Sequence, residues 1–215
     1  MRVILVHGFQ ASPEMNFHPW LATQLREHGF EVLTPTLPLK TDEELDLSFI
    51  MNEMKRQVGY LRGDDILLGH SLGGFIILQY LEAVEMKETP RAIILVASPW
   101  SVTKPELRRL FIADLDADVI MWKAQQFFVV HSKDDKLVPI DHGKHLAEVL
   151  KAEFIETDGH DHFMGSSYPV LRDLIINIER IPIDFSPGGN LPDDFASIHW
   201  AEHQNREEEV SDELL

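Results

Sequence analysis

The sequence predicts an α/β protein with a mostly parallel sheet of about six strands and helices on both faces. Apolar runs rich in Val, Ile, Leu and Phe alternate along the chain with longer segments of helical spacing. The runs are apolar on both faces, which is typical of strands buried in a parallel sheet. Polar, reactive residues follow several of these runs, and parallel sheets place their sites at the carboxyl ends of their strands.

The expected strands are short, and right-handed crossovers through the intervening helices would join them. They are expected at about residues 2–6, 31–34, 65–69, 92–97, 127–131 and 153–156. The first of these runs is too short for a secretion signal and lacks a small-residue cleavage site behind it, so we interpret it as a core strand.

The first helix is expected to follow Ser12-Pro13-Glu14, an N-cap, a first-turn proline and an early acid, and to end at Gly29. Four further helices are expected over residues 46–61, 74–84, 141–150 and 167–180. Only 28 residues separate Ser98 from Phe127. That stretch leaves room for one or two helices, but not for a separate lid domain.

Composition restricts the classes of function. We expect one domain over residues 1–181 and an acidic, peripheral or partly disordered C-terminal extension over 182–215. The net charge of −17 argues against nucleic acid and anionic membranes as partners. Cysteine is absent, which excludes disulfides and thiol catalysis and suits a reducing compartment. Apolar runs reach about eight residues, against roughly 20 needed to span a bilayer, so we expect a cytoplasmic protein.

Residues 69–74 read Gly-His-Ser-Leu-Gly-Gly, between an apolar run and a helix-like stretch. The pattern predicts a strand, a sharp turn and a helix, with Ser71 at the apex. Such a turn brings the backbone so close that a Cβ at Gly69 or Gly73 would clash. Ser71 would therefore be strained and exposed, as a nucleophile must be.

A serine nucleophile needs a base to accept its proton and an acid to orient the base. His-Ser-Lys-Asp-Asp-Lys-Leu-Val-Pro follows one expected strand at 131–139, and Asp-Gly-His-Asp-His-Phe-Met-Gly follows the next at 158–165. These residues alone leave two candidates for each role. The acid could be Asp134 or Asp135, and the base could be His160 or His162.

These strings, together with Val-His-Gly-Phe at 6–9, resemble those of α/β-hydrolases over about residues 1–180. The resemblance is to the small, lidless serine hydrolases of the YdeN-like and retinoblastoma-binding type. It implies that Asp135, three residues before a Val-Pro pair, is the acid and that His162, which precedes a Phe, is the base. It also implies an oxyanion hole of backbone N–H groups from Leu72 and from Phe9, with Gln10 as the alternative to Phe9.

No cofactor or metal is expected. Six of the eleven histidines form close pairs, at 142 and 145, 160 and 162, and 199 and 203, whereas a zinc site needs three or four ligands. The glycines of 69–74 do not match a phosphate-binding loop. His70 and His131 are each expected to serve packing and a hydrogen bond, and Trp100 could overhang the site. The L-x-C-x-E motif associated with the retinoblastoma-binding relatives requires a cysteine, so that partner is not expected.

The sequence therefore predicts a serine hydrolase that forms an acyl-enzyme on Ser71 and acts on a small-molecule ester or amide. Two alternatives stay open. The same residues could transfer an acyl group to an acceptor other than water. The chain could also be a non-catalytic interaction protein on a hydrolase scaffold.

Overall fold

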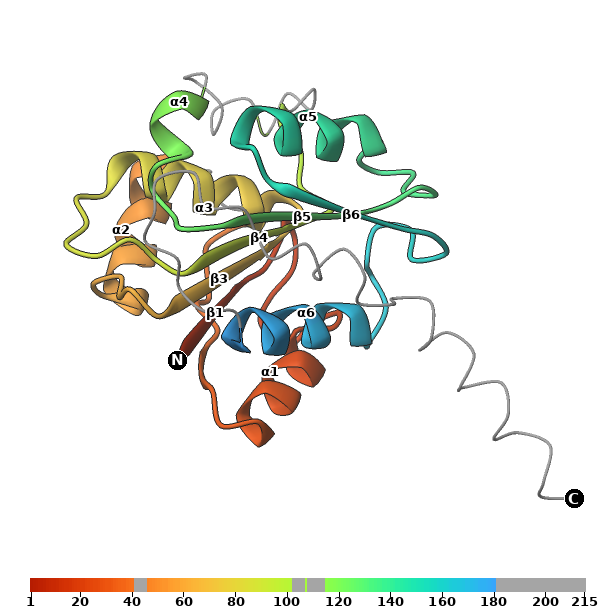
Figure 1. Ribbon diagram of the computed structural model, residues 1–215, viewed down its shortest axis with the longest axis horizontal. Coiled ribbons are helices and arrows are strands. Elements are labelled where there is room, and N and C mark those ends of the chain that lie inside the picture. The colour runs from red at the N-terminus through yellow and green to blue at the C-terminus, as the bar shows by residue number, and fades with distance from the viewer. Residues whose placement is uncertain (41–45, 102–106, 108–114, 181–215) are drawn as a thin grey trace, which may run out of the picture. The chain divides into compact units, whose positions relative to one another are not determined.

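The computed structural model describes residues 1–40, 46–101, 107 and 115–180. Strands and helices alternate along these residues (Figure 1). In chain order they are β1 (Arg2–Val6), α1 (His18–Glu27), β2 (Glu31–Leu33), α2 (Leu47–Val58), β3 (Asp65–His70), α3 (Leu72–Ala83), β4 (Ala92–Val96), α4 (Ala117–Ile120), β5 (Phe127–Ser132), α5 (Ile140–Leu150), β6 (Glu153–Thr157) and α6 (Pro169–Arg180).

The six strands form one sheet in the order β2-β1-β3-β4-β5-β6, and every neighbouring pair is parallel. The predicted fold class is confirmed. Val6 pairs with Gly69, and His70 pairs with Val96, so the carboxyl ends of β1, β3 and β4 meet at one edge of the sheet. The loops that leave this edge carry the residues discussed below.

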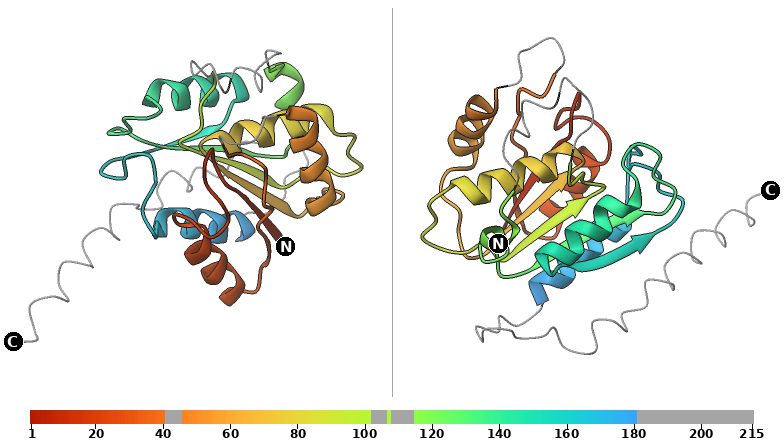
Figure 2. Two further views of the ribbon diagram at one scale, coloured as in Figure 1. Left: turned by 180° about the vertical axis from the view of Figure 1, so that it is seen from behind. Right: turned by 90° about the horizontal axis from the view of Figure 1, so that it is seen from above.

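Helices cover both faces of the sheet. α1 and the beginning of α6 lie on one face, and α2, α3 and α5 lie on the other (Figures 1 and 2). Residues Leu72 to Leu81 of α3 are all buried, which explains why this helix is apolar around most of its circumference. Among the described residues between β4 and β5, only α4 forms an α-helix.

The expected start of the first helix is wrong. α1 begins at His18 and not beside Ser12, whose Oγ instead accepts a hydrogen bond from the Glu14 N–H at 3.3 Å in a local turn. Asn16 has a left-handed backbone (φ 54°), which interrupts the helix before it can form. The first-turn proline of α1 is therefore Pro19.

Two other helix boundaries have clear local causes. The Asp46 side chain caps α2 by accepting the Phe49 N–H, and Gly59 ends that helix with a φ of 71°. α3 begins at Leu72, two residues before the expected position, because Ser71 itself occupies the N-cap. Ser71 thus belongs both to the turn after β3 and to the start of α3.

The described chain divides after Ile175 into a first compact unit, Met1–Ile175, and a second, Ile176–Leu215, of which only residues 176–180 are described. The expected extension, 182–215, lies outside the described residues. No helix in the described part of the chain has the length and apolar character needed to cross a membrane.

A buried ion pair joins the amino ends of β1 and β3. Arg2 Nε lies 2.8 Å from Asp65 Oδ1, and a second guanidinium nitrogen contacts Oδ2 at 2.5 Å. The same guanidinium donates to the carbonyls of Val58 and Tyr60, and Asp65 also accepts the Arg62 N–H. Both charged side chains are almost inaccessible to solvent, so each depends on the other for compensation of its charge.

We expect Asp65→Asn to lower the free energy of unfolding by about 3 kcal/mol or more, because it leaves the buried Arg2 without a counter-charge. Glu31 and Arg62 form a half-exposed pair at 3.0 Å, and Glu31→Gln should cost less than about 1 kcal/mol. Denaturant unfolding of both variants measures the two losses. Equal losses would contradict the assignment of the Arg2–Asp65 pair as a main determinant of stability.

Candidate active site

Ser71 lies at the turn between β3 and α3 with a φ of 53°, a strained conformation for a residue other than glycine. Its N–H donates to the Val96 carbonyl at 2.8 Å, which fixes the turn on the neighbouring strand. A Cβ on Gly69 would collide with the backbone of Gly74, and one on Gly73 would collide with the carbonyls that end β1. The small residues of the motif therefore allow the turn to form.

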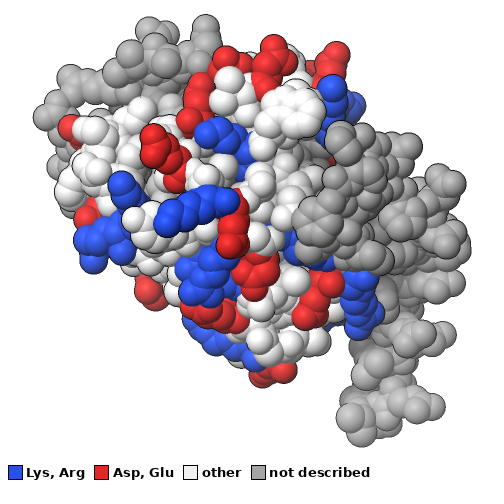
Figure 3. Space-filling view, turned by 60° about the vertical axis from the view of Figure 1, so that its left-hand side comes forward, with Lys and Arg blue, Asp and Glu red and all other residues white. Residues whose placement is uncertain are grey.

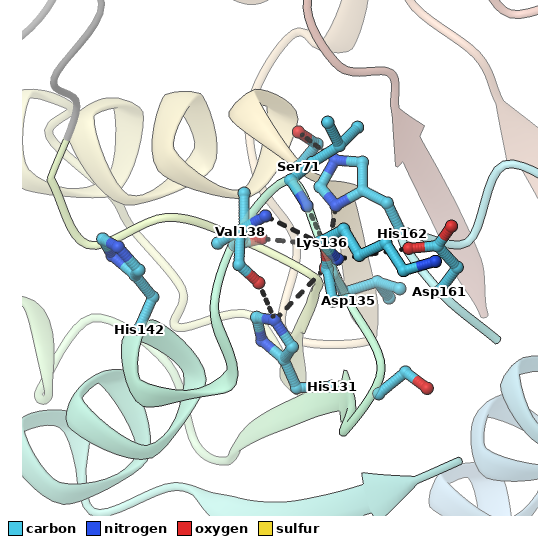
Figure 4. Close-up of polar contacts among 12 residues, drawn as sticks. Ser71, His131, Asp135, Lys136, Val138, His142, Asp161 and His162 are labelled. Carbon is cyan, nitrogen blue, oxygen red and sulfur yellow. Dashed lines mark hydrogen bonds and ion pairs between the residues drawn. The ribbon is translucent and has the colours of Figure 1, made fainter. Parts of the chain in front are cut away.

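His162 contacts Ser71 from the loop between β6 and α6. Its Nε2 lies 2.9 Å from Ser71 Oγ, and its Nδ1 lies 2.8 Å from Asp135 Oδ2 (Figure 4). The residues on either side of His162, Asp161 and Phe163, both have positive φ values, 46° and 55°. Phe163 is fully buried and anchors this strained loop in the core.

Asp135 lies in the loop after β5, with its carboxylate held from several sides. Oδ1 accepts the N–H groups of Leu137 and Val138, both at 2.9 Å. Burial opposes ionisation, but hydrogen bonds from His131, His162 and the Val138 amide outweigh it, and the pKa of Asp135 lies well below its usual value. The carboxylate is therefore ionised at neutral pH and faces the imidazole.

The two competing residues occupy supporting positions. Asp134 is exposed, and its Oδ1 accepts hydrogen bonds from Ser132 Oγ and from the Asp161 N–H, which links the two loops of the site. His160 stacks edge-on against Phe163 and Tyr168 at ring distances of 5.4 and 5.2 Å. Of the two candidate pairs, the structure brings Asp135 and His162 to Ser71.

The expected oxyanion amides lie on either side of Ser71. Leu72 follows it directly, and Phe9 belongs to the loop after β1. A Cβ on Gly8 would come within 3.0 Å of Ser71 Cβ, so this loop passes very close to the serine. The Gln10 N–H donates to the Leu39 carbonyl at 2.8 Å, whereas neither Phe9 nor Leu72 donates to a backbone carbonyl within the described residues.

His7 fixes the loop that carries Phe9. Its Nδ1 lies 2.9 Å from the Gly8 carbonyl, and its Nε2 accepts the Leu37 N–H at 3.0 Å, so the proton is on Nδ1. Burial lowers the pKa of His7, which keeps this ring neutral. The buried imidazole thus joins the strand exit to the segment after β2.

His70, expected to pack and to form a hydrogen bond, contacts the loop of the base. Its Nε2 lies 2.8 Å from the His162 carbonyl, and burial lowers the pKa of His70 to about 3. A neutral ring with the proton on Nε2 therefore holds His162 in place. The sequence predicted a hydrogen bond from His70 but not its partner, the carbonyl of the catalytic-base candidate His162.

Trp100 contacts α5. Its backbone N–H donates to His142 Nδ1 at 3.2 Å, and its indole ring meets the His145 ring edge-on, with the ring centroids 4.8 Å apart. These two histidines formed one of the pairs considered for a metal. Among the residues that the structure describes, no three His, Cys, Asp or Glu side chains gather in a way that could hold a metal ion.

Comparisons with known proteins agree with this geometry. The profile of the family described as serine hydrolase matches residues 3–168. YdeN of Bacillus subtilis (strain 168) is 29% identical over 185 residues, which cover 81% of this chain and 94% of YdeN. The crystal structure of the ydeN gene product matches with a TM-score of 0.76 at 26% identity, covering 83% of this chain and 98% of that one.

Two more distant structures share the fold. An esterase domain from Rhodothermus marinus matches with a TM-score of 0.59 at 19% identity, over 83% of this chain and 86% of that one. A serine hydrolase without a lid from Xanthomonas campestris matches with a TM-score of 0.56 at 17% identity, over 83% and 80%. The match to the family profile spans the loop after β1, the serine turn and both loops that carry Asp135 and His162. This chain belongs to the serine hydrolase family, as its YdeN-like motifs predicted.

Proposed function

We propose that the protein is an esterase-like serine hydrolase that forms an acyl-enzyme on Ser71. The observation that carries the proposal is the continuous contact from Ser71 Oγ to His162 Nε2 and from His162 Nδ1 to Asp135. A serine hydroxyl is a weak nucleophile until a base takes its proton, and the base works best when a carboxylate holds its other nitrogen.

In the proposed reaction, Ser71 Oγ attacks the ester carbonyl while its proton passes to His162 Nε2. The tetrahedral intermediate collapses when His162 returns this proton to the departing alcohol, leaving the acyl group on Ser71. Water then attacks the acyl carbonyl as His162 accepts its proton, and the return of that proton to Ser71 releases the carboxylic acid. Asp135 stays ionised and stabilises the imidazolium at each stage.

The oxyanion of each intermediate would lie between the N–H groups of Leu72 and Phe9. Phe9 is favoured over Gln10 because the Gln10 amide already donates to Leu39. The Leu72 amide begins α3, where the helix dipole also favours negative charge. Backbone donors of this kind are prearranged and need no reorganisation during the reaction.

Substrate preference is proposed to favour uncharged esters. Leu137 and Met164 each lie two residues after a member of the triad, and their side chains are 64% and 55% exposed. Apolar side chains on the loops that carry Asp135 and His162 suit an acyl or alcohol group without charge. On the face drawn in Figure 3, Lys and Arg side chains lie among Asp and Glu side chains.

Labelling with a fluorophosphonate tests the activated serine. We expect the native protein to react and the adduct to map by mass spectrometry to the peptide that contains Ser71. Labelling should vanish in Ser71→Ala and persist in Ser101→Ala, which removes an exposed serine that is not a member of the triad. A folded native protein that does not react would reject the mechanism and favour an interaction protein on a hydrolase scaffold.

A further inference from the structure

The carboxylate of Asp135 is shared by two histidines. Its Oδ2 lies 2.8 Å from Nδ1 of His162 and 3.3 Å from Nε2 of His131, which approaches from β5 (Figure 4). Nε2 of His131 also lies 2.8 Å from the Val138 carbonyl. His131 is completely buried, yet it lies directly behind the group that is proposed to orient the catalytic base.

The contacts of His131 define where its proton lies. A carbonyl oxygen and an ionised carboxylate only accept hydrogen bonds, so Nε2 must be the protonated nitrogen. Nδ1 is buried and has no hydrogen-bond partner among the described residues. Gly143 of α5 packs against this side of the ring, since a Cβ there would come within 3.0 Å of the ring carbon Cγ. The ring is therefore clamped with its donor directed at Asp135 and Val138.

We propose that His131 is a positioning residue for the reaction proposed above, on which this inference rests. Two backbone amides hold Oδ1 of Asp135, and His131 holds Oδ2 on the side away from His162. These two hydrogen bonds and the 3.3 Å contact from His131 together restrict rotation of the carboxylate. The second lone pair of Oδ2 then stays directed at Nδ1 of His162 throughout the proton transfers.

The contact of the His131 N–H with Oδ2 also has an electrostatic consequence. A donor on Oδ2 withdraws negative charge from the oxygen that faces His162. Without that donor, the carboxylate would attract a proton on the imidazole more strongly. The acid limb of the pH profile of kcat/KM should then move to higher pH, because the base would be protonated over a wider range.

Other titratable groups interact with His131 and Asp135. His142 of α5 interacts electrostatically with both His131 and Asp135, Asp141 lies next to it, and His70 of β3 acts on Asp135. Both variants at residue 131 keep these groups and remove the same imidazole from beside His142. A comparison of two variants at this position therefore isolates the contribution of the Nε2 donor.

His131→Met and His131→Gln form a matched pair. Both side chains are unbranched and reach the position of Nε2, but only Gln places an N–H donor there. With a p-nitrophenyl ester as substrate, we expect Met to lower kcat by roughly 10- to 100-fold with little change in KM, as for loss of a hydrogen bond to a charged group. Gln should restore kcat to within about fivefold of the native value and leave the acid limb in place.

A second measurement does not depend on turnover. The proton between His162 Nδ1 and Asp135 should give a low-field ¹H NMR resonance whose chemical shift changes in His131→Met and not in His131→Gln. Equal losses of kcat in both variants, or a lower melting temperature in Met with unchanged kcat, pH profile and resonance, would make His131 a packing residue only. If the native protein neither labels nor turns over, the proposed function fails, and the resonance still decides whether His131 positions Asp135.

Discussion

Substitution of His162 by alanine is expected to lower kcat by on the order of 10⁵-fold, because Ser71 then has no group to accept its proton. Nε2 of His162 lies 2.9 Å from the serine oxygen, within range for direct proton transfer. KM should change far less, since the imidazole is proposed to act on the serine and on the departing alcohol. Steady-state kinetics with a p-nitrophenyl ester and fluorophosphonate labelling measure both effects.

His160→Ala is the matched control, two residues earlier in the same loop. Its ring contacts Phe163 and Tyr168, so its loss should cost stability of about 1 kcal/mol and lower kcat by less than about tenfold. Its backbone N–H, which donates to Ser132 Oγ, is kept in the variant. If His160→Ala abolished labelling while His162→Ala preserved it, the base would be misassigned.

The sheet was predictable from sequence because its strands are buried on both faces. β1, β3, β4 and β5 each form an uninterrupted buried run, and such runs are visible without any knowledge of tertiary contacts. The start of α1 was not predictable in this way. Ser12 has the character of an N-cap, but the left-handed Asn16 separates it from the helix, and residue type alone does not indicate that conformation.

The candidate site likewise has one part that local sequence predicts and another that it does not. The turn around Ser71 could be predicted because its glycines are required by local backbone geometry. The choice between His160 and His162 could not be derived from residue type, since both follow the same strand. The supporting roles of His7 and His70 depend on contacts between distant segments, such as the 2.8 Å bond from His70 to the carbonyl of His162. His131 contacts residues only four and seven positions further on, but residue type alone does not show that its ring turns toward them.

Asp135→Asn is expected to lower kcat by on the order of 10³- to 10⁴-fold, through the wrong tautomer of His162. The amides of Leu137 and Val138 both donate to Oδ1 and would bind the single carbonyl oxygen of the new side chain. Its NH₂ group would then take the place of Oδ2 and donate to Nδ1 of His162. The proton of the imidazole would move to Nε2, which could no longer accept one from Ser71.

Asp134→Asn tests the alternative acid and should change kcat by less than about threefold. Its amide oxygen can still accept hydrogen bonds from Ser132 Oγ and from the Asp161 N–H, the two contacts that link the loops. A larger loss of kcat in Asp134→Asn than in Asp135→Asn would transfer the role of the acid to Asp134, because only the orienting carboxylate controls the tautomer of the base.

The Asp135→Asn variant should also lose less stability on acidification than the native protein. The native pKa of Asp135 is depressed, so its carboxylate stabilises the fold above its unfolded pKa of about 3.9. This contribution is lost as the pH falls from that value through the lower pKa of the native state.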